Sequence, residues 1–152
     1  MRFPLFTDNH VREPIVAGLR RLGWNVIRAI DAFPEATPDE ILFEYAARHG
    51  CAIVTNDKGI HRIAVAWIAA SRPCRMIFWE QGQGRKGAPA DGAVIDAIEA
   101  LAQNPLAFGY PVEYIKGPEV DACPTGPRGR WGLMRGPLLA DPADCLAEAG
   151  RQ

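Results

Sequence analysis

The amino-acid sequence predicts an α/β domain built on a mainly parallel sheet of four or five strands, followed by an irregular tail. Strand-like and helix-like segments alternate four times, which is the pattern of successive βαβ units. The length of 152 residues suits one domain with a substantial core. Proline and glycine become dense after residue 116, and helical periodicity ends there. We therefore expect an α/β domain at 1–116 and a Pro/Gly-rich C-terminal tail at 117–152.

The first elements follow from apolar spacing and from breakers. Residues 2–7 (RFPLFT) form an apolar strand candidate, in which Pro4 indicates an edge strand or an irregular start. Apolar residues then recur at helical spacing across 10–23, and Gly23 stands where a C-terminal cap belongs. A second strand is predicted over 24–30.

The same reading extends through the rest of the domain. Turn residues and changes of apolar period separate the segments. Asp91 is the expected N-cap of the last helix. The predicted elements are a helix at 38–50, a strand at 51–55, a helix at 58–71, a strand at 75–80, a glycine-rich loop at 81–90, a helix at 91–103 and a strand at 111–116.

Composition excludes several classes of protein. The net charge of −1 gives no global positive field for nucleic acid, although a local basic rim could still bind one. The four cysteines have neither zinc-ligand spacing nor the pattern of a disulfide framework. The longest apolar run, IAVAWIAA, is too short to cross a bilayer, and an aspartate at position 8 is incompatible with a signal peptide. We expect a cytoplasmic protein that makes no membrane contact.

Acidic residues stand where the predicted strands end. LFTDNH places Asp8 after the first strand, and AIVTND places Asp57 after the third. Asp39 and Glu40 open the second helix, which starts at the same edge of the sheet. Ligands of open parallel sheets bind at that edge. Converging carboxylates repel unless a cation lies between them, and oxygen ligands of this kind suit Mg²⁺ or Mn²⁺.

Each of these acids also has a purely structural interpretation. TPDE reads as a capping box with Thr37 as the N-cap and Glu40 at the third helical position, where Asp39 would favour the helix dipole. Asp57 could cap the third helix, and Asp8 could cap the first. Spacing alone leaves both interpretations open, and for Asp39 they are compatible.

Three stretches of the chain, spread over residues 1–80, resemble the compact PIN-like domains of bacteria. They are RFPLFTDNHV, VAGLRRLGWNVIRA and TPDEILFEYAARHGCAIVTNDKGI, of which the last is the most specific. These domains are related to PIN ribonucleases and to VapC-type toxins. The resemblance implies a PIN-like three-layer fold with helices on both faces of the sheet.

The resemblance also implies an activity. It points to a Mg²⁺- or Mn²⁺-dependent endoribonuclease in which Asp8, Asp39 and Asp57 bind the metal and serve catalysis. Such an enzyme would take RNA as its substrate. As a toxin it would pair with an antitoxin protein, and a homodimer is compatible with either role. The alternative is an impaired PIN-like domain that binds RNA or a protein without cleaving.

The chain departs from the family pattern in two places. The family usually continues T-x-D-K with an aspartate and an aromatic residue, where this chain has Gly59 and Ile60. At the first aspartate the family favours Asp-Glu-Asn, where this chain has Asp8, Asn9 and His10. Each change removes an oxygen that could hold a metal ion or orient water. Weak metal affinity, altered metal choice and lost activity are all consistent with these changes.

Further residues could support such a site. His10 and Asn56 are candidate supporting groups together with Glu40, although a solvated loop and a helix cap explain the first two equally well. His61 is expected on the surface. The candidate nucleic-acid contacts, which could also be solvated charges, are Lys58, Arg62, Arg85 and Lys86.

Overall fold

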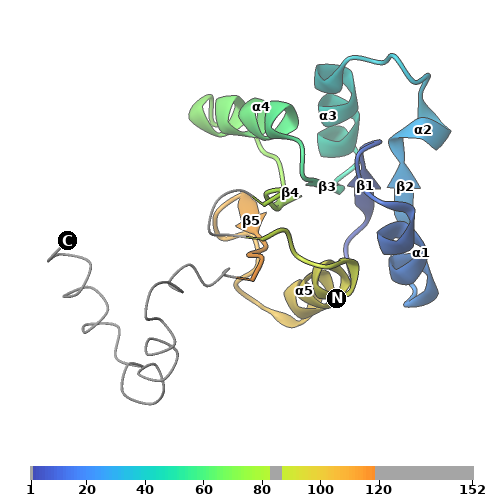
Figure 1. The fold of residues 1–152 in the computed structure, drawn as a ribbon. Helices are drawn as coiled ribbons and strands as arrows, with labels where there is room; N and C mark the ends of the chain where they lie inside the picture. The colour runs from blue at the N-terminus through green and yellow to red at the C-terminus, as the bar shows by residue number, and fades with distance from the viewer. Residues whose placement is uncertain (1, 83–86, 119–152) are drawn as a thin grey trace, which may run out of the picture. The chain divides into compact units, whose positions relative to one another are not determined.

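The protein forms three layers, with a five-stranded sheet between two sets of helices (Figure 1). The structure is a computed structural model that describes residues 2–82 and 87–118. The predicted α/β class is confirmed, and each predicted helix and strand is present, the helix at 91–103 with the predicted bounds and the others with shorter ones. Residues 29 and 30 of the predicted second strand instead belong to a short helix that the sequence did not predict. The elements are β1 (Leu5–Thr7), α1 (Glu13–Arg21), β2 (Val26–Arg28), α2 (Ala29–Ala32), α3 (Asp39–Arg48), β3 (Ala52–Thr55), α4 (Lys58–Ala69), β4 (Met76–Phe78), α5 (Asp91–Gln103) and β5 (Val112–Tyr114).

The strands run in the order β2-β1-β3-β4-β5, and all four neighbouring pairs are parallel. β1 therefore lies inside the sheet, so of the two alternatives predicted from Pro4 the edge strand is wrong, while the strand does begin only after Pro4. Pro4 precedes the strand, so its missing N–H removes no bond from the ladder, while its carbonyl accepts the N–H of Ala52 at 2.9 Å.

Each face of the sheet has its own core. Leu5, Val54 and Ile77 point to the face that α1 and α5 cover. Phe6, Ile53 and Met76 alternate with them and point to the face covered by α2, α3 and α4 (Figure 1). Strands buried on both faces read as continuous apolar runs, which is why the segments LFT, AIVT and MIF contain no charged residue.

The two helices on the first face pack closely. Gly18 of α1 faces Ile95 of α5, and a β-carbon at Gly18 would collide with that side chain. Trp24, which is 3% exposed, donates from Nε1 to Glu99 of α5 at 2.9 Å. Arg2 pairs with the same carboxylate at 3.1 Å. Glycine at position 18 thus leaves room for the end of the Ile95 side chain between the two helices.

The predicted N-caps of α3 and α5 are wrong. The N-cap of α3 is Pro38, and the Thr37 hydroxyl donates instead to the carbonyl of Pro34 at 2.7 Å. The N-cap of α5 is Ala90, and Asp91 lies 3.3 Å from the guanidinium of Arg12. In both cases the side chain that was expected to cap the helix interacts instead with a group outside that helix.

The predicted tail at 117–152 lies outside the described residues except for 117 and 118, so its boundary stays a prediction. Within the two described stretches, no helix combines the length and the apolar character that crossing a bilayer requires.

Candidate metal centre

The site lies where the chain connections diverge. β1 leads into α1 on one face of the sheet, and the adjacent β3 leads into α4 on the other. A crevice at the carboxyl ends of the strands is expected at such a switch point. Asp8 follows β1 and Asp57 follows β3, so the topology brings both to this crevice.

Asp8 is buried without a partner. It is 6% exposed, and neither carboxylate oxygen accepts a hydrogen bond of normal geometry from the described residues. Burial raises its pKa to about 6; the charge of His10 and the Thr55 hydroxyl lower it, and Asp57 raises it further. The Thr55 hydroxyl and the backbone N–H of His10 are close enough to lower the pKa of Asp8, but neither makes a hydrogen bond of normal geometry to its carboxylate. A cation would supply the missing contact.

Asp57 has two roles. Its Oδ1 accepts the N–H of Gly59 at 2.7 Å and caps α4, which confirms the capping interpretation. Its Oδ2 lies 3.4 Å from Nε2 of His10. The backbone N–H of Asp57 is held by the Thr55 hydroxyl at 3.0 Å, which fixes the turn that presents the carboxylate. One oxygen is therefore structural and the other faces the crevice.

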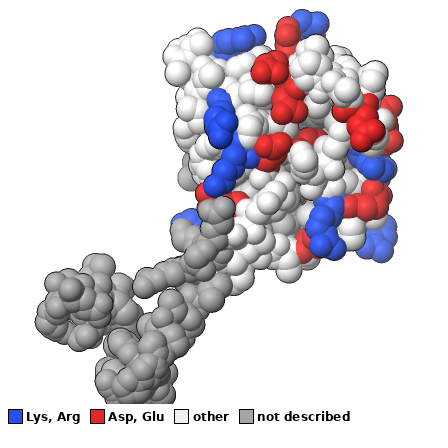
Figure 2. Space-filling model, turned by 45° about the horizontal axis from the view of Figure 1, so that its top comes forward, with Lys and Arg blue, Asp and Glu red and all other residues white. Residues whose placement is uncertain are grey.

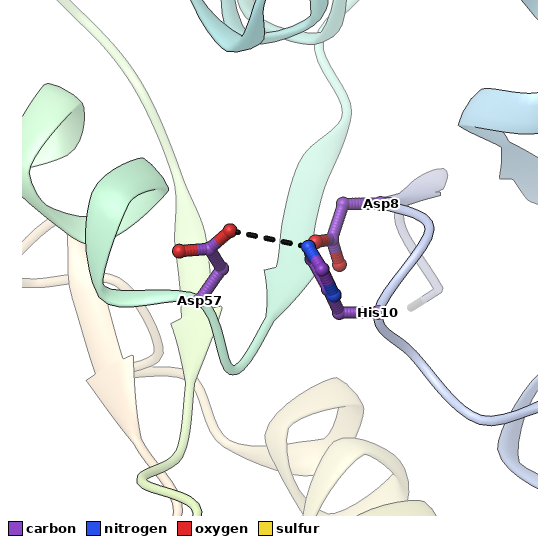
Figure 3. Close-up of side chains that lie close together, drawn as sticks. All are labelled: Asp8, His10 and Asp57. Carbon is purple, nitrogen blue, oxygen red and sulfur yellow. Dashed lines mark ion pairs between the residues drawn. The ribbon is translucent and has the colours of Figure 1, made fainter. Parts of the chain in front are cut away.

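His10 completes a three-residue group. One ligand atom each from Asp8, His10 and Asp57 lies within 4.8 Å of the others, and Figure 3 shows the three side chains turned toward one another. The sequence suggested His10 only as a supporting residue. By contrast, the interpretation of Asp8 as the cap of α1 is wrong, since Arg12 holds the N-cap position there.

Asp39 lies near this group but outside it. Its pKa is raised by burial and then by the charges of Asp57 and Glu40, while His10 lowers it. It is half-buried at the start of α3, whereas Glu40 is exposed. Of the two neighbouring acids, Asp39 is therefore the one that interacts with the crevice, and it does so at longer range than Asp8.

A cleft of about 300 Å³ opens over Asp57, and it is lined by His10, Asn56, Asp57, Lys58, Glu80 and Gln81. Glu80 was missed by the sequence reasoning, although it directly follows the strand segment RMIFW. Asn56 is present as expected, and its Oδ1 is buried without a hydrogen-bond partner among the described residues. Asn56 and Gln81 also line a second hollow of about 370 Å³. The two hollows therefore adjoin along the edge of the sheet.

Basic side chains lie beside the acidic ones on one face of the molecule (Figure 2). Lys58 lines the cleft, and the exposed Arg62 follows one turn later in α4. Figure 2 shows acidic side chains near the middle of one face, with basic side chains beside them. Arg85 and Lys86, the other two predicted nucleic-acid contacts, lie outside the described residues.

His61 is less exposed than expected. Its Nε2 lies 2.9 Å from the hydroxyl oxygen of Tyr114, and its ring packs on Phe78 with centroids 4.6 Å apart. Burial lowers its pKa, and the charge of Glu80 opposes that shift. His61 was predicted to be a simple surface residue. This contact could not be foreseen, because Tyr114 belongs to β5, which is distant in sequence.

Comparison with known proteins gives the class. A family model described as a PIN-like domain matches residues 1–79, which is just over half of the chain. The chain therefore belongs to the PIN-like domain family, a nuclease-type family. Neither a curated protein nor a solved structure gives a match. The matched segment includes Asp8, His10 and Asp57 and ends before Glu80.

Proposed function

We propose that the protein is a metal-dependent ribonuclease that hydrolyses phosphodiester bonds in RNA. The observation that carries this proposal is the buried, unpartnered carboxylate of Asp8, which faces His10 and Asp57. An isolated buried carboxylate is unfavourable, and a divalent cation between these groups removes that cost. Membership of a nuclease-type family supports the same conclusion.

The residues present fit a divalent ion. Asp8, His10 and Asp57 would hold it, and Mg²⁺ or Mn²⁺ is the ion proposed for the family's divalent-metal chemistry. When bound, such an ion polarises a phosphate and lowers the pKa of a bound water. Asp39 adds negative charge beside the ligands. Glu80, which follows β4 and lines the same cleft as His10, is proposed to accept a proton from water.

Lys58 and Arg62 are proposed to contact the RNA backbone. Both follow the capping carboxylate of Asp57 within the first turns of α4, and Lys58 lines the cleft itself. A phosphate drawn to these cations would lie next to the three-residue group. Neither residue reads base identity, so this contact provides affinity rather than sequence preference.

The test is RNA cleavage with and without a divalent ion. Purified protein is incubated with labelled single-stranded RNA in EDTA, then with Mg²⁺ or Mn²⁺, and compared with Asp57→Asn. Cleavage that needs the ion and falls at least about a hundredfold in the variant supports the proposal. Equal cleavage by the variant would indicate a contaminating nuclease and contradict it.

A second candidate function is an impaired domain that binds RNA or a protein. The observation that favours it is Gly59, which stands where the family carries a further aspartate, so two carboxylates and one imidazole form the close group. Restoring the acid with Gly59→Asp should then create or increase cleavage. Gly59→Ala is the matched control, since any β-carbon there would lie 3.2 Å from Oδ1 of Asp57.

The toxin role is a further part of the proposal. A toxin ribonuclease would arrest growth when expressed alone and would be neutralised by a co-expressed antitoxin protein. Growth arrest that Asp57→Asn abolishes would support this role. Normal growth despite measured RNA cleavage would leave a housekeeping ribonuclease instead.

A further inference from the structure

We propose that His10 is a nitrogen ligand of the bound ion, so that the centre favours a divalent transition-metal ion such as Zn²⁺ over Mg²⁺. This inference rests on the proposed function, because it concerns the ion of the same centre. The close group of Asp8, His10 and Asp57 contains one imidazole beside two carboxylates.

The positions of the three ligand atoms suit one ion. Two atoms that each bind an ion at about 2.1 Å lie about 3 to 4 Å apart. Nε2 of His10 is already 3.4 Å from Oδ2 of Asp57, and the widest separation in the group is within 4.8 Å. A modest movement would therefore complete the coordination.

His10 is the residue able to make that movement. Its side chain is 62% exposed, and it lies between β1 and α1, outside both core clusters. Asp8 is fixed by burial, and Asp57 is fixed by its hydrogen bond to Gly59. Two held carboxylates and one adjustable imidazole can close around an ion from the open side of the cleft.

A simple ion pair between His10 and Asp57 accounts for less of the structure. Exposed pairs of this kind contribute little to stability. The pair also leaves both oxygens of Asp8 without a partner. Coordination by all three residues satisfies Asp8 as well, and its formal charges balance, since two carboxylates and a neutral imidazole neutralise a divalent cation.

Ligand chemistry then determines the preferred metal. Imidazole nitrogen binds Zn²⁺ and other transition-metal ions readily, whereas Mg²⁺ strongly prefers oxygen ligands. Compared with a centre of oxygen ligands alone, one that includes the imidazole of His10 should therefore bind Mg²⁺ more weakly relative to these ions. The transition-metal series outcompetes Mg²⁺ at many sites, so the informative quantity is how the ratio of affinities changes when the imidazole is removed.

The test follows the imidazole directly. The chain contains three histidines, His10, His49 and His61, so protein labelled with ¹⁵N-histidine gives three ring systems that single substitutions assign. During a Zn²⁺ titration we expect the ring nitrogens of His10 to shift and saturate at one equivalent. His61, which contacts Tyr114 outside the group, should not respond in this way.

The matched variant is His10→Asn, which keeps a polar side chain but removes the imidazole. Calorimetry should show a loss of Zn²⁺ affinity of at least about tenfold, with the Mg²⁺ affinity changed much less. Zn²⁺ binding that leaves the His10 signals unchanged would overturn the inference and leave the proposed metal-dependent activity standing. Binding of neither ion would overturn both. Coordination by His10 without RNA cleavage would support the inference and contradict the proposed function.

Discussion

The backbone N–H of Gly59 donates to Oδ1 of Asp57 at 2.7 Å, while Oδ2 of the same carboxylate faces His10. One side chain therefore ends the turn after β3, starts α4 and contributes to the candidate metal centre. The structural interpretation of this strand end is confirmed, and the proposed metal-binding role is compatible with it because the two use different oxygen atoms.

Because the two oxygens of Asp57 have different contacts, we expect two variants at this position to differ in stability but not in activity. Asp57→Asn keeps an oxygen that can cap α4 and removes the charge, whereas Asp57→Ala removes both. The alanine variant should lose about 1 kcal/mol of unfolding free energy relative to the asparagine variant. Both should lose metal-dependent cleavage. Urea denaturation in EDTA measures the first effect, and equal stability of the two variants would show that the cap contributes little.

Asp8 predicts a pH-dependent stability of the metal-free protein. Below about pH 3.8 the carboxyl is protonated in both the folded and the unfolded chain, so it costs nothing. Between pH 3.8 and about 6 the unfolded chain ionises first, and the folded state loses stability. Above about pH 6 the full cost is present, on the order of 3 kcal/mol.

Substitution of Asp8 should remove that dependence. The free energy of unfolding of Asp8→Asn, relative to wild type, should rise between pH 4 and pH 8 by roughly 1 to 3 kcal/mol. Measuring the change with pH cancels any constant cost of the new amide. Asp96→Asn, an exposed acid of α5, is the control and should show no such rise. If the difference in unfolding free energy between Asp8→Asn and wild type did not change with pH, burial would not be raising the pKa of Asp8.

Asp39 and Glu40 form an adjacent pair with different expected effects. Asp39 is half-buried and interacts with Asp57 and His10, whereas Glu40 is exposed. Asp39→Asn should lower kcat for RNA cleavage by about tenfold or more, and Glu40→Gln should change it by less than about twofold. The reverse order would show that Glu40 is the acid that faces the bound ion.

Lys58 should influence RNA binding through charge. Lys58→Ala should weaken binding across sequences and reduce the slope of log affinity against log salt by about 1. Arg48→Ala is the control, because Arg48 is exposed at the C-terminal end of α3, whereas Asp39 near the centre is at its start. Arg48 pairs with Glu44 at 3.1 Å. Fluorescence anisotropy in EDTA separates binding from cleavage. An unchanged salt slope would place the RNA away from the start of α4.

Much of this architecture could be read from local sequence. The spacing of apolar residues and the glycine breakers predicted the four helices α1, α3, α4 and α5. The ends of the predicted strands pointed to Asp8 and Asp57 as candidate site residues. Parallel topology then brings consecutive strand ends to one edge, which is a general rule rather than a property of particular side chains.

The errors arose where a residue has a partner distant in sequence. Pro4 indicates an edge only if strand order is known, and strand order depends on packing across the whole chain. Thr37 has the right spacing for a cap, but the carbonyl of Pro34 accepts its hydroxyl. His10 meets Asp57 through the conformation of a short loop, and Glu80 joins the cleft only because β4 lies beside β3.

The close packing of Gly18 against Ile95 has a practical consequence for expressing the protein. The segment that matches the family stops at residue 79, before α5 and β5. A fragment cut at that point would uncover Leu5, Val54 and Ile77 on one side and open the outer edge of β4, so it should aggregate. The shortest autonomous fragment must extend at least to Tyr114, well past the recognisable family signature.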